Sequence, residues 1–202
     1  MTKRVAIRSA WGSALLTMSS GTQAHLVDSG LGPLYDGALH LLSSPSDLLG
    51  LAALALLASL RGAMAARFTV IALPIAWLLA GLVGRTQPVA VDIHWLSTVS
   101  LLLLGLLVAA DAKLHPIVVL VLATIFGAFH GFINGMSLTS VSAATTALFG
   151  VVLTALFLTL LITTSVASLH HLWMRVVIRI AGSWVAAVGL LMLGRLMQEP
   201  GG

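Results

Sequence analysis

Long apolar runs separated by short polar segments fill most of the chain and predict helices that cross a membrane, because a helix satisfies its own backbone hydrogen bonds in lipid. We interpret six runs as spans: residues 48–60, 68–83, 95–110, 117–133, 146–169 and 176–197, with a hydroxyl-rich loop over 134–145. A span usually takes about 20 residues. We therefore expect the first span to begin near Pro45 and to run past Arg61, unless a short helix over residues 34–42 dips into the outer leaflet. The pattern predicts an all-α, polytopic membrane helix bundle of about six transmembrane helices, forming one domain over residues 25–202.

The first 24 residues have the pattern of a secretory signal peptide. A positive start precedes a short apolar segment, Ala10 to Met18, and small residues at Thr22 and Ala24 suit a cleavage site. We expect cleavage after Ala24, so that His25 becomes the mature terminus and its free amine and imidazole can chelate a metal together. The alternative is an uncleaved amphipathic lead-in.

Composition supports a membrane protein. The chain is 59% hydrophobic and 8% charged, whereas a soluble domain averages roughly 25% charged residues. There is no cysteine, which excludes a disulfide or a thiolate metal site. The basic residues are thinly spread and do not indicate nucleic-acid binding.

Loop charge predicts the orientation, since cytoplasmic loops carry an excess of Lys and Arg. With the mature N-terminus outside, the outer side carries only Arg85 and Arg195. The inner side then carries Arg61, Arg67, Lys113, Arg175 and Arg179. We expect a multi-pass protein of the bacterial inner (cytoplasmic) membrane with its mature N-terminus on the periplasmic side.

Candidate chemistry is concentrated between residues 25 and 47, where acidic residues and histidines lie together in a chain poor in charge. Ionisable groups in or at a membrane are costly to desolvate and indicate function. Asp36 and His40 are four residues apart and would share a helix face. Their oxygen and nitrogen donors suit a divalent cation, although a structural hydrogen-bonded pair is the alternative. Asp28 is better explained as a turn former, and Ser46 or Asp47 as a helix cap.

A second candidate set lies in the fourth span. At about 1.5 Å per residue, His130 lies roughly 20 Å from the start of that span, in its outer half, and Asn134 is one turn further on the same face. Both sets therefore fall at similar depth, which favours one shared site, although His130 could instead be a satisfied structural histidine. Asp92 and His94 lie at the outer mouth of the third span, where His94 could equally be an interfacial anchor.

Other residues around these sets suggest packing and an exit. Gly127, Gly131 and Gly135 repeat every four residues, a ridge that lets another helix approach closely. Polar residues predicted on the inner side suggest a release site for an ion: Asp111, His115, His170 and His171.

Two segments carry a resemblance to a known family. They are A-H-L-V-D-S-G-L-G-P-L-Y-D-G-A-L-H-L, residues 24–41, and F-H-G-F-I-N-G, residues 129–135. The chain resembles the HupE/UreJ family, and more closely its second branch, over essentially the whole mature length. The resemblance implies a six-span permease or an accessory protein of hydrogenase and urease maturation that handles Ni²⁺, with Co²⁺ or other divalent metals as alternatives.

Carried over by motif, the metal residues would be His25, Asp36, His40 and His130, with Asp92, His94 and Asn134 as further candidates. In the main branch the first motif has Asp directly before its His. The later motif there carries a second His and an acidic residue, which look replaced here by Ile133-Asn134 and their neighbours. A less anionic site keeps copper and zinc open beside nickel.

Three functions remain in view. A divalent metal permease is favoured, because polar residues are predicted on both membrane faces. An intramembrane zinc hydrolase would need Asp92 or Asp28 as a base, and the chain lacks an H-E-x-x-H motif, so we do not expect an enzyme. A non-transporting subunit that docks a metallochaperone is the third. The expected partners are a transition-metal ion, membrane lipid, and a second copy or an accessory protein.

Overall fold

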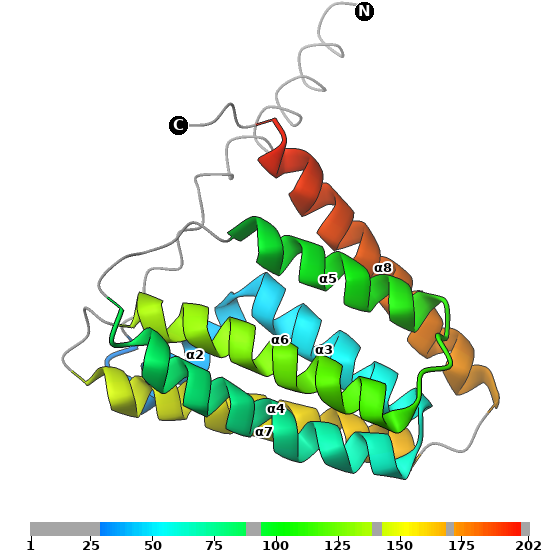
Figure 1. Cartoon of the computed structure of the whole chain (residues 1–202), viewed down its shortest axis with the longest axis horizontal. Helices are drawn as coiled ribbons and strands as arrows, with labels where there is room; N and C mark the ends of the chain where they lie inside the picture. Colours follow the sequence, from blue (N-terminus) through cyan, green and yellow to red (C-terminus); the bar gives the residue numbers. More distant parts are fainter. Residues whose placement is uncertain (1–28, 88–93, 139–142, 169–171, 199–202) are drawn as a thin grey trace, which may run out of the picture.

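A computed structural model describes residues 29–87, 94–138, 143–168 and 172–198. The predicted signal peptide, His25, Asp28, Asp92, His170 and His171 lie outside these ranges. The described residues form seven helices and no strand, which confirms the all-α prediction (Figure 1). The helices are α2 (Pro33–Ser43), α3 (Pro45–Leu60), α4 (Ala63–Gly84), α5 (His94–Ala109), α6 (Pro116–Ser137), α7 (Ala144–Ala167) and α8 (Leu172–Leu196).

Four of these helices, α4, α6, α7 and α8, are long and apolar enough to cross a membrane. Helices α2 and α3 pass the same test only together, as a pair bent by 75° that forms a broken span or a re-entrant loop. Helix α5 is apolar but has only 16 residues, fewer than the about 20 of a usual span. The described residues thus make a helical membrane protein, while the predicted count of six spans rests on accepting the bent pair and the short helix.

The bend between α2 and α3 comes from the local sequence. Ser44 is extended, with φ −89° and ψ 104°, as expected for a residue before proline, and Pro45 opens α3. At its other end α3 stops at Leu60, and Gly62 turns the chain with φ +101°, a conformation that glycine adopts without strain. The expectation that this span runs past Arg61 is therefore wrong. The predicted loop 134–145 is also shorter than expected, because α6 continues to Ser137.

Helix α3 is the centre of the bundle and contacts every other described helix. Its fully buried side chains include Leu51, Leu54 and Leu57. Around it, successive helices run in alternating directions, and α5 lies beside α8 along its length (Figure 1). The first turn of α3, near its bend with α2, is consequently surrounded by protein.

Glycines let three helix pairs come into backbone contact: α4 with α6, α2 with α7, and α5 with α8. A Cβ atom on Gly131 would lie 2.2 Å from the carbonyl oxygen of Trp77, and one on Gly135 would lie 2.2 Å from that of Gly81. Gly37 of α2 is as close to α7, since its Cβ would lie 1.9 Å from the oxygen of Ala147. The predicted glycine ridge on the fourth span is confirmed, and its partner is α4.

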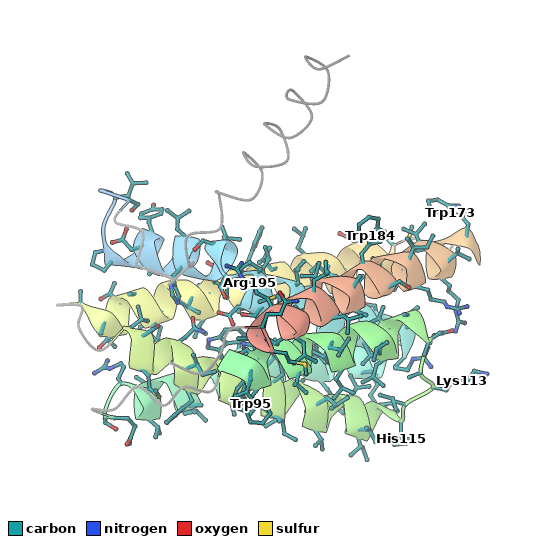
Figure 2. All side chains as sticks on the ribbon, turned by 90° about the horizontal axis from the view of Figure 1, so that it is seen from above. Trp95, Lys113, His115, Trp173, Trp184 and Arg195 are labelled. Atoms are coloured by element: carbon teal, nitrogen blue, oxygen red, sulfur yellow. The ribbon has the colours of Figure 1, made fainter. Side chains whose placement is uncertain are left out.

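Basic residues gather at the end of the bundle where α3, α5 and α7 finish and α4, α6 and α8 begin. Figure 2 shows Lys113, His115 and Trp173 at this end and Trp95 and Arg195 away from it. The Asp111 carboxylate accepts hydrogen bonds from Arg61 and, at 2.5 Å, from Arg175. One carboxylate thereby ties together the end of α3, the α5–α6 turn and the start of α8.

These arginines change the pKa of Asp111, which lies in the turn. Burial raises the pKa of this carboxyl, but the hydrogen bond and charge of Arg175 and the charges of Arg61 and Arg179 outweigh burial and hold the pKa below its usual value. A carboxyl with a lowered pKa stabilises the fold at every pH above its ordinary value. That contribution is lost only as the pH falls through the lowered pKa.

Replacing Arg61 with glutamine should destabilise the protein more than replacing Arg175 with glutamine. The Arg61 side chain is 8% exposed and that of Arg175 is 56% exposed. An exposed ion pair contributes about 0.2–1 kcal/mol, whereas breaking a desolvated one costs more, so we expect about 1–2 kcal/mol for Arg61→Gln. Thermal unfolding in detergent measures both variants. The loss of stability in Arg61→Gln should be constant from about pH 8 to about pH 5. A larger loss of stability in Arg175→Gln would show that the buried pair of Arg61 with Asp111 is not the stronger of the two.

Candidate functional site: a buried aspartate–histidine centre

The first turn of α3 and the last half of α6 meet at a buried carboxylate–imidazole pair. Asp47 and His130 are 5% and 1% exposed, and the Nδ1 atom of His130 lies 2.5 Å from Oδ1 of Asp47. The second carboxylate oxygen accepts a hydrogen bond from the Asn134 side-chain amide at 2.9 Å. The same amide nitrogen donates to the His130 carbonyl oxygen, one turn earlier. Both carboxylate oxygens of Asp47 are therefore held by α6.

Helix α5 contributes a hydroxyl to the other side of the imidazole. Ser100 Oγ lies 3.1 Å from Nε2 of His130 and also donates to the Ser97 carbonyl oxygen at 2.7 Å. A hydroxyl has one proton, so Ser100 can donate to the carbonyl or to the ring nitrogen, but not fully to both. If it donates to the carbonyl, its oxygen is free to accept from a protonated Nε2. Ser100 can thus accommodate either protonation state of this ring nitrogen.

Aromatic rings enclose the imidazole. The Phe126 ring stacks on His130 with centroids 4.1 Å apart, and the Trp77 ring centroid lies 5.9 Å away. Gly50 of α3 leaves room for Phe126, since a Cβ at Gly50 would lie 2.7 Å from the ring. The aromatic rings keep the Asp47–His130 pair in an apolar setting, where an unpaired carboxylate charge would be costly.

Three buried polar atoms at this centre have no hydrogen-bond partner among the described residues. They are Nδ1 of His40, Oδ1 of Asn134 and Nε1 of Trp77. His40 is 4% exposed and lies close enough to Asp47 to interact with its charge. Buried polar groups are nearly always paired, so these atoms call for an explanation. A ring nitrogen and an amide oxygen are both able to donate a lone pair to a cation.

The structure brings together three of the residues that sequence reasoning selected. His40, His130 and Asn134 gather around Asp47. Asp36 lies at the start of α2, where it accepts hydrogen bonds from the backbone nitrogen and the hydroxyl of Ser29 at 2.8 and 2.5 Å. Among the candidates at the third span, His94 begins α5, its side chain is not described, and Asp92 lies outside the described residues.

The role predicted for Asp47 from the sequence, a helix cap, is wrong. The N-cap residue of α3 is Ser44 rather than Ser46 or Asp47, and the Ser44 side chain makes no capping hydrogen bond. Asp47 instead lies inside the first turn and pairs across the bundle. The signal that could have found it is its position at the start of an apolar membrane helix, where a carboxylate is costly without a partner.

On the basic side, the two described candidates for a release site have structural partners. Asp111 is held by arginines, as described above. His115 caps α6, because its Nδ1 accepts a hydrogen bond from the Ile117 backbone nitrogen at 3.3 Å. In this conformation both side chains are engaged in structural hydrogen bonds.

The ligand atoms at the Asp47 centre are of the types that bind a divalent cation, but in this conformation they are not arranged around a common point. Imidazole nitrogen, carboxylate oxygen and amide oxygen together suit nickel, copper, zinc and cobalt. Within the described ranges, however, no three His, Asp or Glu side chains are grouped closely enough to hold a metal ion. A cation at this centre would have to compete with the hydrogen bond between Asp47 and His130.

These features define a class: a helical membrane protein with a buried carboxylate–imidazole centre joining two helices. The sequence model described as HupE / UreJ protein matches residues 13–192, and the chain belongs to this family. The family is associated with nickel or cobalt transport or with accessory roles. No curated protein and no solved structure matches the chain.

Proposed function

We propose that this protein is a divalent transition-metal permease and that Ni²⁺ is its favoured cargo, with Co²⁺, Cu²⁺ and Zn²⁺ as further candidates. The observation that supports this most is the buried Asp47–His130 pair together with two atoms that have no hydrogen-bond partner and could each give a lone pair to a metal ion, His40 Nδ1 and Asn134 Oδ1. A carboxylate in the membrane interior is costly, and a divalent cation would compensate it. The preference for nickel comes from the family. Affinity alone follows the Irving–Williams order of divalent metals and would favour copper.

In this proposal His40 and His130 bind the ion at the Asp47 centre, with Asn134 as an additional oxygen donor. His25, Asp36, Asp92 and His94 would capture the ion before it reaches the centre. The orientation we propose follows from the charges: Arg61, Arg67 and Lys113 lie at the end where α4 and α6 begin, and the positive-inside rule assigns that end to the cytoplasm. The Asp47 centre would then lie toward the periplasmic side of a bacterial inner membrane.

A non-transporting accessory subunit is the second candidate. No three His, Asp or Glu side chains of the described residues form a ready metal group, as an accessory subunit that completes its site with a partner would have it. In that case the protein would hold a metal only when a metallochaperone or another membrane component joins it. Neither role is enzymatic.

The proposal predicts that the purified protein binds about one divalent ion per chain and that His40→Gln loses this binding. His40 is the sharpest test, because its Nδ1 has no hydrogen bond to lose, and so the fold should keep its stability. Calorimetric titration with nickel, cobalt, copper and zinc in parallel measures the affinity. His130→Ala should also lose the ion, whereas His115→Gln, at the opposite end, is the matched control and should keep it.

Uptake into proteoliposomes then separates the two candidate functions. A permease should accumulate the metal that it binds, and His40→Gln should abolish accumulation. An accessory subunit should bind the ion without accumulating it. Metal binding that is unchanged in both His40→Gln and His130→Ala would contradict the shared site.

A further inference from the structure

An open hollow lies between the first turns of α4 and the last turns of α7, at the basic end of the bundle. Its volume is about 330 Å³. Most of its lining is apolar, including Val70, Ile71 and Leu160. Ile71 is 60% and Leu160 47% exposed, so this wall faces the surroundings of the bundle rather than its core. In a membrane protein, such a surface contacts lipid.

Arg67 is the one charged residue in the lining of this hollow. It is exposed and makes no hydrogen bond or ion pair with another described residue. Two threonines also line the hollow, but the hydroxyls of Thr163 and Thr164 donate to carbonyl oxygens of their own helix. The guanidinium therefore has free donors next to an apolar wall and no acidic neighbour in the lining.

The position of Arg67 suits the boundary between lipid headgroups and acyl chains. It is the fifth residue of α4, which begins at Ala63, so it lies about 6 Å along the helix. This end of the bundle, where α4 begins, also carries Lys113 and the arginines around Asp111. Basic residues at this level of a membrane protein attract anionic headgroups, and a guanidinium matches two phosphate oxygens at once.

We propose that the α4–α7 hollow binds an anionic glycerophospholipid. Its phosphate would accept hydrogen bonds from Arg67, and one acyl chain would lie along Ile71 and Leu160. This inference does not depend on the metal-binding proposal, because the hollow and the Asp47 centre lie at opposite ends of the helices.

Native mass spectrometry of the delipidated full-length protein, titrated with phosphatidylglycerol or phosphatidylcholine, tests the proposal. Phosphatidylglycerol should bind more tightly, and Arg67→Gln should weaken it about fivefold, the factor expected for one basic residue near an anionic surface. Lys113→Gln removes the same charge at the same end but outside the hollow, and should leave the affinity within about twofold. Ala167→Phe, which fills the hollow without changing charge, should weaken phosphatidylglycerol binding as well.

Three results would each overturn the proposal. In the first, phosphatidylcholine binds as tightly as phosphatidylglycerol, so that the hollow takes any lipid. In the second, Arg67→Gln and Lys113→Gln weaken binding equally, which would indicate a general effect of charge. In the third, inorganic phosphate displaces the lipid at a similar concentration, which would make Arg67 a simple anion site.

Discussion

Replacing Asp47 with alanine is expected to cost about 3–5 kcal/mol of stability, because the change leaves two buried donors without an acceptor. These donors are one N–H group on Nδ1 of His130 and one on Nδ2 of Asn134, each of which bonds one carboxylate oxygen of Asp47. The other N–H group of Asn134 keeps its bond to the His130 carbonyl oxygen. No water can replace the carboxylate easily, since His130 is 1% exposed and is covered by Phe126. The loss would be measured as a fall in the thermal midpoint of unfolding in detergent.

Asp47→Asn separates the hydrogen bonds from the charge. An asparagine keeps the shape of the side chain, but an NH2 group replaces one of the two carboxylate oxygens. The remaining oxygen can accept from His130 or from Asn134, and the NH2 group faces the other donor. We expect a loss of roughly half that of Asp47→Ala. Metal binding should be lost in both variants, because the site no longer has a carboxylate.

Asp36→Ala is the matched control for stability. Asp36 is the other carboxylate of the α2–α3 region, yet both of its hydrogen bonds go to Ser29, close in sequence. We expect a much smaller loss of stability for this variant than for Asp47→Ala, because its hydrogen bonds are local and solvent can replace them. Equal losses in Asp36→Ala and Asp47→Ala would show that Asp47 does not hold α3 and α6 together. The effect of Asp36→Ala on metal affinity also tests whether Asp36 captures the ion.

The helices were largely predictable from the apolar runs. The predicted spans 68–83, 117–133 and 146–169 correspond to α4, α6 and α7. Helices α4 and α6 extend beyond the predicted spans at both ends, whereas α7 begins and ends two residues earlier than predicted. The end of α3 was missed because the expected length of a span, about 20 residues, was given more weight than the end of the apolar run. The apolar run itself ends at Leu60, and Gly62 two residues later is the local signal for the turn that the structure has there.

That His40 and His130 lie near one centre could be predicted from depth in the membrane, but the role of Asp47 in that centre could not. Counting residues along the spans placed His40 and His130 at a similar level. Asp47 was assigned to capping because aspartate at a helix start usually caps. That local preference lost to the tertiary pairing with His130, which satisfies the carboxylate far from water. The partner of Asp36 was also unpredictable, because Ser29 precedes the helix and its placement depends on the turn at Gly30 and Gly32.

Gly131→Ala is the second change for which we expect a large effect, and it acts through the backbone rather than through charge. The added Cβ would lie 2.2 Å from the carbonyl oxygen and 2.6 Å from the Cα atom of Trp77. Backbone atoms cannot turn aside as the end of a flexible side chain can, so α4 and α6 must separate. Overpacking of this kind costs about 3 kcal/mol at the upper end of its usual range. The higher helix propensity of alanine recovers up to about 1 kcal/mol.

The separation should reach the Asp47 centre, because Gly131 follows His130 directly in α6 and Trp77 of α4 contacts the His130 ring. We therefore expect Gly131→Ala to lower both the unfolding temperature and the metal affinity, although it removes no polar atom. Gly194→Ala is the matched control, since a Cβ at Gly194 of α8 meets nothing within 4 Å. The unfolding temperature of Gly194→Ala should be unchanged or higher than that of the original protein. If Gly131→Ala were as stable as Gly194→Ala, the close α4–α6 contact would not be what positions His130 against Asp47.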